Sequence, residues 1–151
     1  MPTARDHPDP FDLQRFVRAQ ETVYAQVLAE LRGGKKRTHW MWFIFPQLDG
    51  LGYSATAKRY AIKSRAEARQ YLNHLILGKR LIACTEAILA ISGRSASDIF
   101  GSPDDVKLRS SMTLFAAVAP PDSVFAQVLA RYFQGQPDSK TLSLLAQHPA
   151  E

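Results

Sequence analysis

Residues 39–45 form the stretch His39-Trp40-Met41-Trp42-Phe43-Ile44-Phe45, which is followed by Pro46. Six consecutive apolar side chains represent more apolar surface than a loop leaves in water, so this segment must be buried, bound to a partner, or both. Apolar groups on both faces are typical either of a buried strand or of a short buried helix. A lone strand would lack a partner for its backbone amides and carbonyls, and we therefore predict a short buried helix over residues 38–45. Thr38 is placed to cap this helix, and Pro46 disfavours helical geometry at Phe45.

Apolar periodicity indicates helices along the rest of the chain, and no stretch shows the sustained alternation of a strand. The predicted fold class is therefore all-α: a single compact domain of seven or eight helices with no sheet. The longest predicted helix has Asp9 as N-cap and Pro10 at its first position, continues through Leu31 and is ended by two glycines. Further helices are predicted to begin at the capping-box sequence 64–67, near Gly78, at 103–105, at Asp122 and at Asp138.

The chain has 151 residues, which is near the usual size of one domain. We predict a flexible segment over residues 1–8, a helical domain over 9–147 and a tail over 148–151. No apolar run approaches the roughly 20 residues that a membrane-spanning helix requires, and the N-terminus lacks the layout of an export signal. A cytoplasmic protein without membrane contact is therefore expected. The single Cys84 excludes an intramolecular disulfide, and its apolar helical surroundings predict a buried, inert thiol.

The net charge of +5 conceals a strong segregation along the chain. Residues 1–31 carry a net charge of −2, residues 32–80 of +9 and residues 81–151 of −2. Clustered lysine and arginine side chains attract phosphate-bearing partners. They are also typical of the solvated faces of short helices, and the sequence leaves both interpretations open.

Motifs with a family resemblance recur along most of the chain, at 9–13, 15–17, 19–20, 30–32, Lys36, 39–43, 45–48, 50–52, 59–60, 67–68, 71–72, 77–78, 80–81, 99–101, 103–105 and 107–115. These motifs resemble a bacterial family of unknown function, domain-of-unknown-function family 1810, whose members are sometimes labelled calpastatin. The resemblance spans roughly residues 9–145 and implies a small multihelical domain in a bacterial cytoplasm, with no established activity. The calpastatin label carries no weight, because nothing here resembles the repeated disordered segments of that protease inhibitor. Leu75 departs from the family pattern, in which proline is expected, and this affects the start of the next helix.

A ligand site is predicted around the aromatic segment. A flat ring can stack on Trp40 or Trp42, and a phosphate can then meet nearby cationic side chains such as Lys36, Arg37 or Arg59. A second polar cluster follows the Ser-Pro-Asp-Asp helix start, where free backbone amides favour anions. The candidate ligand-binding residues are Lys36, Arg37, His39, Trp40, Trp42, Gln47, Arg59, Tyr60, Lys107, Arg109, Ser110 and Ser111.

Other interpretations of the same residues stay open. The aromatic residues can be core alone, with Asp104 and Asp105 only capping a helix. For catalysis the candidates are His39, because histidine side chains serve as general acids and bases, and Asp105. His39 with Asp104 or Asp105 would suit a nucleotide or ADP-ribose-type hydrolase. The histidines lack metal-ligand spacing, so no metal site and no cofactor are predicted.

The leading functional prediction is a bacterial helical protein that binds a small anionic or phosphorylated, nucleotide-like ligand in a cationic, aromatic-lined cleft. A scaffold or protein-interaction module without a ligand is one alternative. A single-stranded nucleic-acid binder is another, although contiguous aromatic residues flanked by turns argue against it. The sequence leaves the oligomeric state open.

Overall fold

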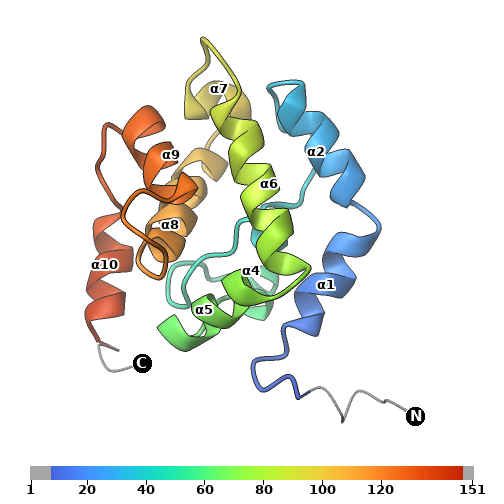
Figure 1. Cartoon of the computed structure of the whole chain (residues 1–151), viewed down its shortest axis with the longest axis vertical. Coiled ribbons are helices and arrows are strands. Elements are labelled where there is room, and N and C mark those ends of the chain that lie inside the picture. The colour runs from blue at the N-terminus through green and yellow to red at the C-terminus, as the bar shows by residue number, and fades with distance from the viewer. Residues whose placement is uncertain (1–7, 148–151) are drawn as a thin grey trace.

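Helices provide the regular structure of residues 8–147, the part of the chain that the computed structural model describes (Figure 1). In chain order they are α1 (Gln14–Glu21), α2 (Tyr24–Arg32), α3 (Met41–Ile44), α4 (Ala55–Arg59), α5 (Arg65–Asn73), α6 (Leu77–Leu89), α7 (Ala96–Phe100), α8 (Asp104–Ala116), α9 (Val124–Tyr132) and α10 (Ser139–Ala146). The all-α prediction is confirmed, with ten helices in this range in place of seven or eight. The predicted flexible segment 1–8, apart from Pro8, and the predicted tail 148–151 lie outside the described residues.

The long N-terminal helix predicted from Pro10 to Leu31 is two helices, α1 and α2, and this part of the prediction is wrong. The break falls at the β-branched pair Thr22 and Val23, and Val23 leaves the helical region with φ −121°. The first helix also begins later than predicted, because Asp12 has φ +52°.

Side-chain caps fix most of the other helix starts. The side chains of Ser64 and Asp138 accept hydrogen bonds from the backbone amides of Glu67 and Thr141, as the sequence predicts for the starts of α5 and α10. The cap of α9 is Ser123, one residue beyond the predicted Asp122. Asp9 accepts the amides of Leu13 and Gln14, so it binds the first turn of α1 although Pro10 lies before that helix.

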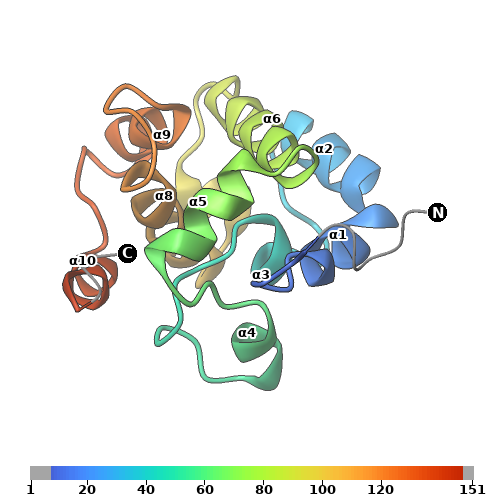
Figure 2. The ribbon, with the colours of Figure 1, turned by 60° about the horizontal axis from the view of Figure 1, so that its bottom comes forward.

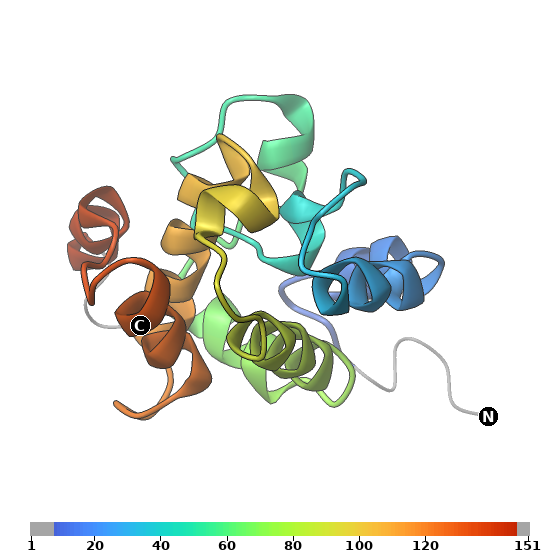
Figure 3. The same cartoon turned by 90° about the horizontal axis from the view of Figure 1, so that it is seen from above.

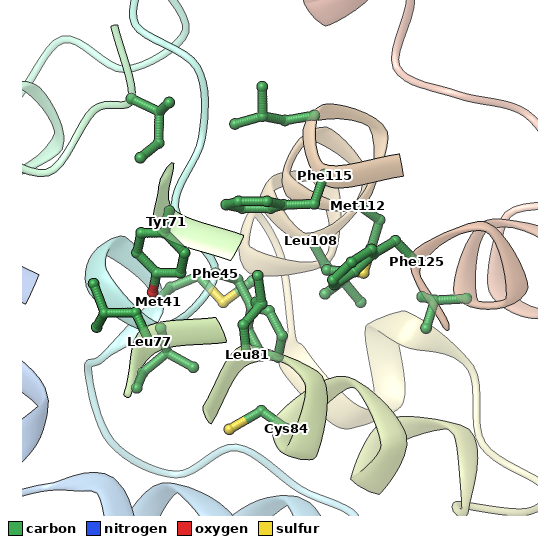
Figure 4. Close-up of a cluster of buried hydrophobic side chains, with 14 of the residues drawn as sticks. Met41, Phe45, Tyr71, Leu77, Leu81, Cys84, Leu108, Met112, Phe115 and Phe125 are labelled. Atoms are coloured by element: carbon green, nitrogen blue, oxygen red, sulfur yellow. The ribbon is translucent and has the colours of Figure 1, made fainter. Parts of the chain in front are cut away.

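The core lies between α5, α6, α8 and α9, with the buried side of α3 packed against it (Figure 4). Tyr71 and Phe115 pack with ring centroids 5.3 Å apart, and Phe115 and Phe125 with centroids 5.7 Å apart. Cys84 is buried in the same core, and burial raises the pKa of its thiol to about 12. The thiol is therefore protonated near neutral pH and a poor nucleophile.

The segment 46–64, which contains α4, projects from one side of the molecule (Figure 2). Its two ends are joined where Leu48 and Ile62 pair in parallel, with the Asp49 amide 2.8 Å from the Ile62 carbonyl oxygen. Helix α10 packs on α8 at the edge of the molecule opposite α1 and α2 (Figure 3). No helix within residues 8–147 is long and apolar enough to cross a membrane.

Arg15 binds three parts of this scaffold together. Its guanidinium donates to the backbone carbonyls of Phe11, Asp12, Arg59 and Ala61 at 2.6 to 2.9 Å, and to the Glu67 carboxylate at 2.8 Å. Both partners of this ion pair are buried, and a guanidinium has five N–H groups, all of which are used here. A further hydrogen bond brings the backbone amide of Lys63 to the same carboxylate. The pair thus holds both the start of α1 and the base of segment 46–64 against α5.

Candidate ligand-binding cleft

The aromatic segment folds as the short helix α3, with Trp40 at its N-cap and Phe45 at its end. The prediction of a short buried helix is confirmed, but it starts at Met41, and Thr38 does not cap it. Trp40, Met41, Ile44 and Phe45 are buried, whereas Trp42 is only half-buried. A single helical turn therefore divides the segment into a core side and a side on which Trp42 reaches the surface.

Glu30 of α2 fixes the loop that leads into α3. Its buried carboxylate accepts five hydrogen bonds, from the Gln26 amide, the Arg37 backbone amide, the Thr38 backbone amide and hydroxyl, and the Trp40 indole, at 2.6 to 3.1 Å. Burial alone raises the pKa of this carboxyl, but the donors outweigh burial and lower its pKa to about 2. A buried negative charge therefore orients the first tryptophan of the segment.

Two lysines and one aspartate connect the two tryptophans to the start of α8. The Lys36 ammonium lies 5.1 Å from the Trp40 ring centre and 2.9 Å from one carboxylate oxygen of Asp104. The other oxygen of Asp104 is 3.5 Å from the Lys107 ammonium, which lies 5.6 Å from the Trp42 ring centre. The Lys36 side chain is only 6% exposed and that of Lys107 is 29% exposed. This lysine–aspartate–lysine bridge thus has a sealed end at Trp40 and an open end at Trp42.

The open end faces a cleft of about 460 Å³ between segment 46–64, the first half of α8 and the start of α10. We call it the Trp42 cleft, and its walls are formed by Trp42, Gln47, Leu51, Gly52, Tyr53, Ser54, Ala57, Pro103, Val106, Lys107, Ser110, Asp138 and Lys140. A narrow recess behind it shares Trp42 and Gln47 and extends to Tyr60. The volume lies within the range of pockets that take small molecules or cofactors.

A second hollow, of about 390 Å³, lies between the ends of α2 and α6, where Arg32 and Arg94 flank small residues. It has no aromatic side chain in its lining, and both of its arginines are exposed. The described residues include no group of three or more histidine, cysteine or carboxylate side chains that could hold a metal ion. The Trp42 cleft is larger than this hollow, and it brings a ring face, two lysines and neutral hydrogen-bonding groups together.

Comparison with known proteins shows the family to which this chain belongs. The sequence profile of the family described as "Protein of unknown function (DUF1810)" matches residues 10–145. The chain belongs to this family. The crystal structure of the conserved hypothetical protein Rv1873 from Mycobacterium tuberculosis is similar to it, with 55% sequence identity and a TM-score of 0.90, over 91% of this chain and 99% of that one. No curated protein matches the chain.

In this DUF1810 chain, four of the candidate binding residues line the cleft together: Trp42, Gln47, Lys107 and Ser110. Tyr60 lines the recess behind them. The Gln47 side-chain amide makes no hydrogen bond within residues 8–147, so it is available to a ligand. Two motifs far apart in the sequence thus meet in one site.

The structure places the other candidates elsewhere. Trp40 is core, Lys36 is in the buried ion pair described above, and Ser111 is buried in α8 with no hydrogen-bond partner for its hydroxyl within residues 8–147. Arg109 donates to the Gln136 carbonyl beside the Phe133 ring, so it holds the segment before α10.

Four further candidates lie outside the cleft lining. His39 and Arg37 are exposed, and Arg59 borders a shallow hollow next to the Arg15–Glu67 pair. Asp105 is half-buried in the first turn of α8 and does not line the cleft either.

Several lining residues of the DUF1810 cleft are not predicted from the sequence. Tyr53 is 78% exposed and Val106 is 55% exposed, although both are large apolar side chains. Ser54, which caps α4, and Lys140, at the start of α10, complete the rim. The sequence signal for Tyr53 was its position between glycines and a cap residue, which indicates an exposed turn, but its partners from α8 and α10 come from remote parts of the chain.

Proposed function

We propose that this chain binds a small anionic or phosphorylated, nucleotide-like ligand in the Trp42 cleft. The observation that carries the proposal is the Lys107 ammonium held 5.6 Å from the centre of the half-buried Trp42 ring, at the open end of the lysine–aspartate–lysine bridge. A ring face and a cation are thereby presented to the same cavity. Flat anions use this combination, because the ring stacks while the charge meets the ammonium.

The remaining lining supports the same class of ligand. Tyr53 and Val106 are both exposed and both line the cleft. Large apolar side chains that are exposed together mark binding sites, whereas apolar side chains scattered singly over the surface do not. The Gln47 amide and the Ser54 and Ser110 hydroxyls add neutral hydrogen-bonding groups. A few polar groups on a largely apolar wall fix the orientation of a bound small molecule.

Most cations of the positive middle segment, residues 32–80, are exposed, but they are distributed over the end of α2, the loop before α3, α4, α5 and the start of α6, and several of them make internal contacts. Lys36 pairs with Asp104, and Arg80 lies over the Tyr24 ring and donates to Gln20. Phosphate tracking along a nucleic acid requires a continuous groove of available cations. A small ligand makes no such demand.

Substituting Lys107 with methionine is expected to weaken ligand binding about tenfold, because methionine keeps the contact with Trp42 and removes the charge-assisted hydrogen bond. The measurement is a thermal-shift screen of nucleotides, sugar phosphates and aromatic carboxylates at millimolar concentrations, since a ligand that binds only the native state raises the Tm. The matched control is Lys79→Met, which removes the same charge from an exposed residue of α6 outside the cleft. The proposal fails if no compound raises the Tm, or if the Tm rises equally in both variants.

A further inference from the structure

We infer that the Trp42 cleft selects a flat ring that carries a single negative charge, as a carboxylate or a phosphodiester, and that Asp104 sets this selectivity. The inference deepens the proposed function and rests on it. It narrows the ligand from anions in general to monoanions. The argument comes from the charges that surround the half-buried Trp42 ring.

The lining of the cleft carries one net positive charge. Lys107 and Lys140 are its two cations, and Asp138 is its one carboxylate. The Asp138 carboxylate is held in place, because one of its oxygens accepts both the amide and the hydroxyl of Thr141 at 2.9 and 2.6 Å. It cannot turn away from an incoming ligand without uncapping α10. A ligand with one negative charge therefore neutralises the lining, and a second charge on it would be uncompensated.

The Asp104 carboxylate partly cancels the positive potential that Lys107 presents to a ligand. One oxygen of Asp104 is 2.9 Å from the buried Lys36 ammonium and the other is 3.5 Å from Lys107, so the carboxylate lies between the two cations. Lys36 balances Asp104, and the pair adds no net charge to the site. An anion that meets Lys107 nevertheless approaches the Asp104 carboxylate, and like charges at such separations repel. The repulsion is about twice as large for a dianion as for a monoanion.

This role differs from that of a ligand contact. Asp104 does not line the cleft, and it acts through the position and effective charge of Lys107. It is therefore a positioning residue, and its removal should change the charge preference of the site more than the affinity for a monoanion. A merely structural residue would change the affinities for both kinds of ligand in the same proportion.

The test uses four probes that share a phenyl ring: benzamide, benzoate, methyl phenyl phosphate and phenyl phosphate. Near neutral pH they carry no charge, one charge, one charge and close to two charges, and the two phosphorus compounds differ by a methyl group and one charge. Binding is measured from the change in the NMR chemical shift of the Trp42 indole N–H. The same titration of Lys107→Met shows whether the response comes from the cleft. In the parent protein the two monoanions are expected to bind at least as tightly as phenyl phosphate and more tightly than benzamide.

In Asp104→Asn, phenyl phosphate is expected to gain roughly fivefold in affinity relative to methyl phenyl phosphate, the effect of one charge about 4 Å away in water-like surroundings. Because this change leaves Lys36 buried without its partner, the double variant Lys36→Met/Asp104→Asn, which removes both charges, is measured beside it. Asp122→Asn, at an exposed aspartate before α9, is the matched control and should leave the ratio unchanged.

The outcomes separate the inference from the proposed function. If phenyl phosphate binds the parent protein several-fold more tightly than methyl phenyl phosphate, or if neither Asp104 variant changes their ratio, the inference is overturned and anion binding in the cleft stands. If benzamide binds as tightly as benzoate, charge selection is overturned. If none of the four probes moves the Trp42 signal at millimolar concentrations, the proposed function fails, and the inference fails with it.

Discussion

Replacing Arg15 with methionine is expected to lower the free energy of unfolding by about 3 to 5 kcal/mol, because the Glu67 carboxylate would remain buried without its countercharge. Four backbone carbonyls would also lose the donor that joins the start of α1 to residues 59–61. The measurement is urea denaturation followed by far-UV circular dichroism, with the midpoint and slope compared between variants.

Two further variants decide whether the buried pair is the cause. Arg18→Met removes a charge from an exposed position of the same helix and is expected to change the stability by less than about 0.5 kcal/mol. Arg15→Met/Glu67→Met removes both charges and should recover part of the loss, since an apolar pair of similar volume does not leave a charge unpaired. A loss in Arg15→Met no larger than in Arg18→Met would contradict the role assigned to this pair.

The second large effect is expected for Glu30→Gln, which should lower the free energy of unfolding near neutral pH by about 3 kcal/mol. Although burial raises the pKa of this carboxyl, hydrogen bonds from the Thr38 hydroxyl, the Arg37 backbone amide and the side chains of Gln26 and Trp40 lower it to about 2 from an ordinary value of 4.5. Each pKa unit corresponds to about 1.4 kcal/mol. Glutamine keeps one acceptor oxygen, and its N–H₂ group replaces the other. That group then faces either the Gln26 amide and the Thr38 hydroxyl, or the Trp40 indole and the backbone amides of Arg37 and Thr38.

The same shift determines the dependence on pH. The folded state binds the Glu30 proton less tightly than the unfolded state, so the charged carboxylate contributes its full stabilisation above about pH 4.5. That contribution is lost as the pH falls from about 4.5 to about 2. The stability difference between the parent protein and Glu30→Gln should therefore shrink over this range, which denaturant titrations at successive pH values would measure.

Glu86→Gln is the matched control for this experiment, because Glu86 is exposed on α6. Its difference from the parent protein should stay small at every pH. A Glu30→Gln variant as stable as Glu86→Gln at neutral pH would show that the carboxylate does not organise the loop before α3.

Helices with an apolar face or a clear start signal could be predicted from the sequence. A side-chain cap marks the starts of α5 and α10, whereas α6 and α8 were predicted without one. The helices α4 and α7 were not predicted, because five residues are too few to establish an apolar period, and α4 buries none of its side chains. The division of the N-terminal helix was missed because the residues on both sides of Thr22 keep helical spacing. The two helices are separated only where the backbone dihedral angles of Val23 leave the helical region.

The site was predictable in its residue types and not in its assembly. The sequence indicated that Trp42, Gln47, Lys107 and Ser110 belong to motifs with binding chemistry, and the fold brings all four into one cleft. It gave no means of distinguishing Lys36 from Lys107. The first is buried against Asp104 and the second is open, a difference that depends on where α8 packs against α3.

The division of the aromatic segment into a core side and a cleft side also separates the two fluorophores of the chain, since Trp40 and Trp42 are its two tryptophans. The indole of Trp40 is sealed and donates to the Glu30 carboxylate at 2.9 Å, whereas that of Trp42 is half-buried beside an ammonium group. Their emissions should therefore differ in access to a dissolved quencher such as acrylamide. Quenching of Trp42 reports the state of the cleft, while emission from Trp40 reports the integrity of the core, so an acrylamide titration of the unlabelled protein distinguishes occupancy from unfolding.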